Sequence, residues 1–314
     1  MAAPTNAFIS TSAIGNRESL HDLISILNKD ETPLQGMVGS GSAKATYEEW
    51  QIDNLGSATT TNYQLEGNTI AALAITPTTR VGNRLQILSK SFTISTTQET
   101  VDKAGRDSEV NYQALLYGRR GKMDLEASLC QNVASSGSDP RKLGGLETWL
   151  TTNVSRGTTG SSGGFTAGNT VAPTDSSITR APTKALLENV IKSCWDNGGA
   201  PNWLLMGSTI KVAFSTFTGI ATQYQEAKGA PTVHIAGVDR YVSNFGTFSA
   251  TASRFVRGRE ILVIDPKLLR VLYLRKWKKE ELAKASDGRA FLVVAEATLQ
   301  VKNEAGLGIL ADLA

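Results

Sequence analysis

The stretch from residue 46 to residue 133 decides the fold. It opens with TYEEWQID (46–53), passes through a span rich in Ser, Thr, Asn and Gly, and returns as RLQILSKSFT (84–93). A helical pattern follows, EVNYQALLYGRRGKMDLEASLCQNV (109–133). An isolated two-stranded hairpin is only marginally stable in water, so a hairpin this long needs something to pack on. The most available partner is a neighbouring copy of the same chain.

The helical pattern predicts a long spine that starts after Ser108 or Asp107, two equally good N-caps. About 25 residues of helix span close to 40 Å, longer than the ~11–12 residues of an average helix. Gly118 and Gly121 each cost roughly 1 kcal/mol relative to alanine, so we expect both to mark close packing. The apolar stripe is expected to contain Tyr112, Leu115, Leu116, Met123, Ala127, Cys130 and Val133, and the opposite, polar side Arg119, Arg120, Lys122, Asp124 and Glu126.

Helices and strands elsewhere are segregated rather than alternating, which predicts an α+β fold. Residues 153–179 are rich in Gly, Ser and Thr, a composition typical of a disordered loop in a monomer. We nevertheless predict that they are ordered by contacts within or between subunits. The other expected elements are helices at 16–32, 183–195 and 208–217 and strands at 202–206, 232–242, 247–256, 261–264, 271–274 and 291–301.

Composition limits the class of protein. The chain has 314 residues and a formal net charge of +3, too small for the whole protein to be a nucleic-acid binder. It has no run of 18 apolar residues and no secretory signal in residues 1–17, so we expect no membrane partner. The lone cysteines Cys130 and Cys194 suit a reducing cytoplasm.

The sequence offers no convincing catalytic or metal site, so we expect neither an enzyme nor a cofactor. His21 and His234 are far apart, and no cluster has the spacing of metal ligands. GMVGSGSAK (36–44) superficially resembles a phosphate loop, but its lysine does not follow the last glycine directly, which favours a flexible hinge. Glu48 and Glu49 would point to opposite faces of a strand. Glu280 and Glu281 are expected at a solvated helix start.

Basic residues suggest two further contacts. The stretch 254–289 holds eleven Lys or Arg against five Asp or Glu. It is expected to be a solvated face, or to pair with acidic faces of neighbouring subunits. The candidates for contacting nucleic acid by sequence-independent phosphate binding are Arg119, Arg120 and Lys122 on the long helix.

Five phrases in order resemble the major capsid proteins of tailed bacteriophages. They are TPLQG (32–36), QETVDKAGR (98–106), GGLETW (144–149), WDNGGAP (195–201) and EATLQVKN (296–303). The resemblance covers nearly the whole chain and implies the Hong Kong 97-type fold. The implied parts are an N-terminal arm (1–44), an extended loop (45–89), a peripheral domain with the spine helix (90–150), a Gly/Ser/Thr-rich insertion (151–178), an axial domain (179–282) and a terminal strand returning to the peripheral domain (283–314).

By that resemblance the chain would assemble into hexamers and pentamers of an icosahedral or prolate shell that encloses double-stranded DNA. It would be built in the host cytoplasm and found in the virion, with scaffolding, portal and decoration proteins as further possible partners. The candidate inter-subunit contacts are Tyr47, Trp50, Leu65, Ile70, Arg80, Arg84 and Arg106. The alternative is a tail or baseplate protein, or, less in keeping with the sequence, a hydrolase. A tail-tube protein would be shorter and nearly all β.

The chain differs from the best-known member of that family in two ways, and each difference leads to an expectation. No self-cleaved prodomain is visible, so we expect the mature subunit to keep its N-terminus. Residues 45–89 contain no lysine, the residue that some relatives use for covalent Lys–Asn links between subunits. Arg80 and Arg84 cannot substitute, because a guanidinium stays protonated and is a poor nucleophile. We therefore expect a shell without covalent cross-links.

Overall fold

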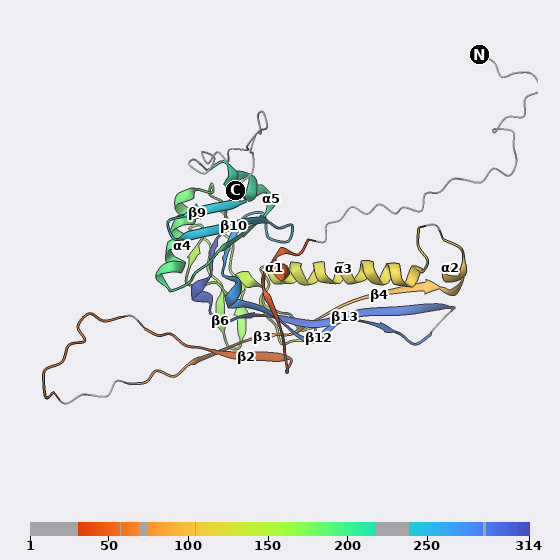
Figure 1. The fold of residues 1–314 in the computed structure, drawn as a ribbon, viewed down its shortest axis with the longest axis horizontal. Coiled ribbons are helices and arrows are strands. Elements are labelled where there is room, and N and C mark those ends of the chain that lie inside the picture. Colours follow the sequence, from red (N-terminus) through yellow and green to blue (C-terminus); the bar gives the residue numbers. More distant parts are fainter. Residues whose placement is uncertain (1–30, 57, 69–73, 104, 218–238, 285–286) are drawn as a thin grey trace, which may run out of the picture.

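The computed structural model describes residues 31–56, 58–68, 74–103, 105–217, 239–284 and 287–314. A long helix lies along a four-stranded sheet, and a six-stranded sheet with two shorter helices stands beside one end of it (Figure 1). A two-stranded arm runs out in the opposite direction from the long helix (Figure 1). The helix expected at 16–32 falls, but for its last two residues, outside the described part of the chain, as do His21, Ile70 and His234.

The four-stranded sheet has the order β1-β12-β13-β4. Strand β1 (Gly39–Ser42) runs parallel to β12 (Leu269–Glu281), while β13 (Gly288–Val301) is antiparallel to both β12 and β4 (Gln86–Ser95). The strand expected at 291–301 is thus confirmed and is three residues longer at its start.

Two expectations about this sheet are wrong. The segment taken for a flexible hinge contains the ordered edge strand β1, because its backbone pairs with Arg270–Tyr273. Glu280 and Glu281 lie in β12 rather than at a helix start. Strand β12 pairs along its length with β13, which pairs in turn with β4, because strand register brings together segments far apart in sequence.

The long helix α3 (Glu109–Cys130) matches the predicted spine, and Ser108 is its N-cap, accepting a hydrogen bond from the Asn111 amide at 3.3 Å. Its sheet-facing side is formed by Val110, Ala114 and Tyr117, which pack with aromatic and aliphatic side chains of β4 and β13. That side is not the predicted stripe.

Two residues show how the prediction failed. Leu115, expected in the apolar stripe, is 54% exposed, whereas Glu126, expected on the polar side, is fully buried. Because α3 carries apolar residues on two sides, helical periodicity alone could not tell which side meets the sheet. The two glycines also differ: a Cβ on Gly121 would lie 2.5 Å from the Trp277 ring, but nothing approaches Gly118 within 4 Å.

The six-stranded sheet has the order β5-β14-β11-β8-β10-β9. Its central strands β11 (Ile261–Ile264) and β8 (Trp203–Met206) are almost entirely buried, as expected of strands covered on both faces. The other strands are β5 (Val154–Ser155), β14 (Gly308–Leu310), β10 (Gly246–Ala252) and β9 (Arg240–Ser243).

Two helices accompany this sheet. Helix α4 (Lys184–Asp196) is capped by the Thr183 hydroxyl and ends at Gly198, which has φ +81°. Helix α5 (Ser208–Ser215) begins after Gly207, so Ser208 is its first residue and not its cap. Of the strand expected at 232–242, the structure describes only the end, within β9.

Short elements complete the chain. They are α1 (Pro33–Met37), β2 (Tyr47–Ile52), β3 (Thr79–Arg84), α2 (Thr96–Thr100), η1 (Leu146–Trp149), β6 (Gly164–Thr166), β7 (Asn169–Val171), η2 (Pro266–Leu268) and η3 (Glu304–Gly306). Among them, η1 is in contact with both β6 and β7. The segment around η1 therefore packs against the Gly/Ser/Thr-rich insertion, in which these two strands lie. The prediction that residues 153–179 are ordered is confirmed, through contacts within the subunit.

Candidate functional site

The arm is the first candidate site. Strands β2 and β3 pair antiparallel from Tyr47↔Arg84 to Ile52↔Thr79. Beyond them the chain runs far from the rest of the subunit (Figure 1). The large apolar side chains on this excursion are exposed: Leu55 105%, Tyr63 80%, Leu65 80% and Ile75 95%. Four such side chains on one polar loop form a surface suited to contact with another molecule.

The base of the arm is fixed to its own subunit. The Trp50 ring lies 5.4 Å from that of Trp149, centroid to centroid, and its Nε1 donates a hydrogen bond to the Val301 carbonyl at 2.8 Å. The Arg84 guanidinium stacks 4.0 Å from the Tyr47 ring. Burial is the main cause that raises the pKa of the Tyr47 hydroxyl. These contacts hold the arm at a set angle.

The remaining predicted contact residues make local ion pairs. Arg80 lies 3.2 Å from Glu49, across the β2–β3 ladder. Arg106 pairs with Glu109 at the start of α3, and its guanidinium lies 5.0 Å from the Tyr112 ring. The structure thus gives Tyr47, Trp50, Arg80, Arg84 and Arg106 partners within one subunit. Their part in contacts between subunits stays a prediction.

The three basic residues predicted to contact nucleic acid lie on different sides of α3. Arg120 and Lys122 are exposed, while Arg119 is half-buried. The Arg120 guanidinium stacks 5.0 Å from the Tyr117 ring. Their contact with DNA stays a prediction.

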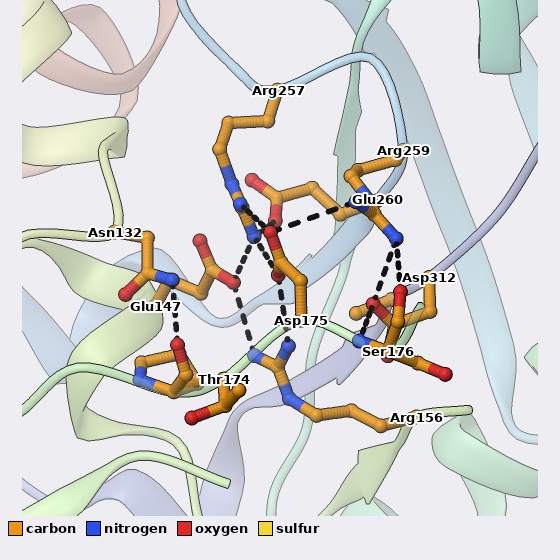
Figure 2. Close-up of polar contacts among 12 residues, drawn as sticks. Asn132, Glu147, Arg156, Thr174, Asp175, Ser176, Arg257, Arg259, Glu260 and Asp312 are labelled. Carbon is orange, nitrogen blue, oxygen red and sulfur yellow. Dashed lines mark hydrogen bonds and ion pairs between the residues drawn. The ribbon is translucent and has the colours of Figure 1, made fainter. Parts of the chain in front are cut away.

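A buried ionic cluster is the second site, and the sequence analysis missed it (Figure 2). Its members come from η1, from both ends of the insertion, from the loop before β11 and from the C-terminal segment after β14. They are Glu147, Arg156, Asp175, Arg257, Arg259, Glu260 and Asp312. Glu147, Glu260 and Asp312 are fully buried.

Arg257 is the centre of the ionic cluster. It forms a two-pronged pair with Asp175, Nη1–Oδ2 2.6 Å and Nη2–Oδ1 3.0 Å. Its Nη2 also contacts Glu147 and lies 3.1 Å from Glu260 Oε2. Arg156 approaches the same Glu147 carboxylate, with its Nη2 at 3.0 Å from Oε1. Two arginines therefore share one buried carboxylate.

The second half of the ionic cluster joins the insertion to the C-terminal segment. Arg259 Nη2 lies 3.2 Å from Asp312 Oδ1 and donates to the Ser176 carbonyl at 3.0 Å. The Asp312 carboxylate also accepts the backbone N–H of Gly157 at 3.0 Å and of Ser176 at 2.9 Å. Asp312 thereby fixes both edges of the insertion at once.

The ionic cluster contains three arginines and four carboxyl groups. Burial raises the pKa of one of these carboxyl groups. The pKa of Glu260 lies well above its usual value, because Glu260 is buried and because the Glu147 charge repels its ionised form. The pKa of Asp175 is lowered by its hydrogen bond from Arg257. Every carboxyl group of the cluster is engaged by a guanidinium or a backbone N–H. Not every polar atom is satisfied, since Glu147 Oε2 and Glu260 Oε1 are buried without a hydrogen-bond partner among the described residues. The arrangement fixes chain segments, because removing one partner would leave a buried charge uncompensated.

Parts of the cluster did carry a sequence signal. Glu147 lies in the quoted GGLETW phrase, and Arg257 and Arg259 belong to the basic stretch 254–289. That stretch was expected to be a solvated face or to pair with neighbouring subunits. Neither role describes these two arginines, because they pair inside their own subunit. Only the tertiary fold brings their partners Asp175 and Asp312 close.

Among the described residues, no group of three or more His, Cys, Asp and Glu side chains is placed to hold a metal ion. None of the described helices combines the length and the apolar character needed to cross a membrane. Cys130 and Cys194 are both buried thiols, and burial raises the pKa of Cys194 to about 12.

Comparison with known proteins adds the decisive observation. The family described as SU10 major capsid protein matches residues 4–314. The chain belongs to this family. The chain is also similar to the major capsid protein of Escherichia phage Phieco32, to which it is 33% identical over 155 residues. That match covers 46% of this chain and 44% of the relative, so the chain spans less than half the length of that protein.

Solved structures agree on the fold. The capsid of cyanophage A-1(L) superposes with a TM-score of 0.65 at 13% identity, over 97% of this chain and 98% of that one. The capsid of a native GTA particle gives 0.61 at 12% identity, over 96% of each. Phage G major capsid protein gives 0.59 at 9% identity over the full length of both. The expected Hong Kong 97-type α+β fold is confirmed, and the family decides against a tail or baseplate protein.

Proposed function

We propose that this chain is the repeating subunit of an icosahedral or prolate head shell. Copies associate as hexamers and pentamers and enclose double-stranded DNA. Its role is structural, without catalysis and without a cofactor. Family membership and fold support this proposal. One feature of the chain itself carries it: in the described part of the arm, Leu55, Tyr63, Leu65 and Ile75 are exposed.

The arm is suited to binding a neighbouring subunit. Burying one Leu or Ile side chain contributes roughly 1.5–3 kcal/mol. The exposed Leu55, Leu65 and Ile75 therefore offer substantial binding free energy to a neighbouring subunit. Because Trp50 and its hydrogen bond fix the base of the arm, little orientational entropy is lost when the loop docks. When each subunit makes this contact with its neighbour, the repeated contact closes a ring of subunits.

Charge supports the same partner. The loop from 53 to 78 carries Asp53 and Glu66 and neither Lys nor Arg. The outer part of β12, from Arg275 to Lys279, is basic and mostly exposed. Opposite charges favour this pairing between copies and disfavour pairing of two arms.

The finer assignments follow from a shell. We assign the four-stranded sheet and α3 to the peripheral domain, and the six-stranded sheet with α4 and α5 to the axial domain; β12 then belongs to the peripheral domain. Within the shell Arg120, exposed beside Tyr117, is suited to sequence-independent contact with DNA phosphates. Assembly would take place in the host cytoplasm, with scaffolding, portal and decoration proteins as partners and no membrane.

Deletion of Gly56–Gly67 tests the proposal. We expect a soluble protein with the thermal transition of the parent, since this loop adds little to the subunit core. Negative-stain microscopy should show monomers or open rings and no closed shells. A matched replacement of the same twelve residues by the permuted sequence controls for length. Closed shells from the deletion protein would refute the proposed role of the arm, and an intact shell that runs as a covalent ladder on a denaturing gel would contradict the expected absence of cross-links.

A further inference from the structure

Two buried glutamates meet at one arginine in the first half of the ionic cluster. The side chains of Glu147 and Glu260 are both 0% exposed. Both reach Arg257 Nη2, which contacts Glu147 Oε1 and lies 3.1 Å from Glu260 Oε2 (Figure 2). The second oxygen of each, Glu147 Oε2 and Glu260 Oε1, is buried and has no hydrogen-bond partner among the described residues. An unpaired buried acceptor is costly, so this pair of carboxyl groups lacks a donor.

The positive charge beside the two glutamates is shared with a third carboxyl group. Arg257 forms its two-pronged pair with Asp175, and Arg156 lies 3.0 Å from Glu147 Oε1 and 3.7 Å from Asp175. Asp175 is 29% exposed and has Arg259 at 3.7 Å, so water and a further guanidinium screen its charge. The two glutamates are fully buried and have no such screening. Two ionised carboxylates this close repel each other strongly in a buried site.

The other charged groups nearby do not compensate this repulsion. Arg259 lies 3.2 Å from Asp312, in the second half of the ionic cluster. Arg180, also beside Asp312, donates to a hydroxyl and to a carbonyl group. The Cys130 thiol is neutral, because burial, followed by the charges of two glutamates, Glu260 among them, raises its pKa. A metal ion would be repelled by the guanidinium groups that already contact both glutamates.

A proton supplies both the missing charge and the missing donor. We propose that Glu260 is protonated at neutral pH and donates a hydrogen bond to Glu147, so that the ionic cluster holds one proton and grips the insertion less firmly as the pH rises. Glu260 carries the proton because two guanidinium groups contact Glu147 and only one contacts Glu260. The raised pKa of Glu260 has matching causes, burial first and then the charge of Glu147. The proposal is independent of shell formation.

The shared proton makes the stability of the subunit fall with rising pH. In the unfolded chain Glu260 loses its proton above about pH 4.5, whereas in the folded chain it keeps the proton up to its raised pKa. Between these two values the folded chain binds one proton more than the unfolded chain. The equilibrium constant for unfolding therefore rises, through this group, by up to about tenfold per pH unit.

Urea unfolding of the full-length subunit between about pH 5.5 and pH 8 tests the proposal. Glu260→Gln has nearly the shape of protonated glutamate and can still donate to Glu147, but it has no proton to lose. The unfolding constant of the parent should rise with pH more steeply than that of the variant, by up to about tenfold per unit. The matched control, Glu66→Gln in the exposed arm loop, should keep the slope of the parent. Parallel profiles for the parent and Glu260→Gln would overturn the proposal.

Infrared spectroscopy of the folded subunit in D2O gives a second readout that needs no unfolding. At neutral pH the parent should show the C=O stretch of a protonated carboxyl group, and Glu260→Gln should lose it. Glu126 is a second buried glutamate whose pKa burial raises, so Glu126→Gln is the control and should retain the Glu260 band. A parent without any protonated carboxyl band, or a band that Glu126→Gln removes completely, would overturn the proposal even if Glu260→Gln failed to fold.

Discussion

The arm loop between residues 53 and 78 and the insertion between 151 and 178 have similar compositions, rich in Ser, Thr, Gly and Asn, but different structures. The insertion folds back on its own subunit and is held by buried ions, by the pairing of Ser161 with Thr174 and by Phe165 stacked 5.6 Å from Trp149. The arm loop leaves its subunit, and its described large apolar side chains are exposed. Composition therefore does not decide whether such a segment is ordered by its own chain. Charged and aromatic residues at a few positions decide it.

The largest expected effect separates assembly from stability. Leu65→Asp combined with Ile75→Asp should abolish closed shells, as counted by negative-stain microscopy. The free energy of unfolding of the subunit should change by less than about 0.5 kcal/mol, because both side chains are exposed in the subunit. Thr60→Asp combined with Thr61→Asp adds the same two charges at exposed positions without removing an apolar contact and should still assemble. A fall in subunit stability with the double variant would show that the arm packs on its own chain.

The next effect concerns the insertion. Arg257→Ala leaves the buried Glu147 and Glu260 without their shared partner, which should lower the free energy of unfolding by about 3–5 kcal/mol in urea titrations. Arg240→Ala, an exposed arginine on β9, should change it by less than about 0.5 kcal/mol. An Arg257→Ala protein as stable as the parent would mean that the ions do not order the insertion.

A smaller effect is expected from the close packing of the insertion on η1. A Cβ at Gly163 would overlap the backbone carbonyl of Thr148, so Gly163→Ala should cost about 1–3 kcal/mol. Thr60→Ala in the exposed arm loop should be neutral. Both can be measured by urea unfolding of purified subunits. Equal stabilities of the two variants would remove the contrast between the regions.

The smallest effect is a pH dependence. The folded-state pKa of Asp175 is lowered, chiefly by the Arg257 hydrogen bond. The stability that this carboxylate contributes is therefore present above its unfolded pKa, near 3.8, and is lost as the pH falls through the lower folded value. Asp175→Asn should flatten the fall in the free energy of unfolding below about pH 4 by up to about 1 kcal/mol. Identical acid profiles for parent and variant would show that Asp175 is not held by Arg257 in solution.

Some features could be predicted because they depend on neighbours in sequence. Ser108 was recognised as one of two candidate N-caps, since an N-cap hydroxyl bonds to a backbone N–H only two or three residues on. The strand pattern of 291–301 was likewise visible. The return strand of the arm was expected at 84–93, but the arm closes with β3, and most of the expected segment is β4 in the four-stranded sheet. The ionic cluster could not be predicted, because Glu147, Arg257 and Asp312 are separated by more than fifty residues and meet only through the sheet register.

The sequence by itself determined the segments: a long spine helix, an arm with no lysine, a strong C-terminal strand and the family to which they belong. The tertiary structure alone decided which side of α3 meets the sheet, that β12 joins β4 and β13, and that a Gly/Ser/Thr-rich insertion is ordered. The physical reason is the distance along the sequence over which each interaction acts. Caps, turns and periodicity act over a few residues, whereas the burial of a charge or of a helix face depends on which distant segments arrive to cover it.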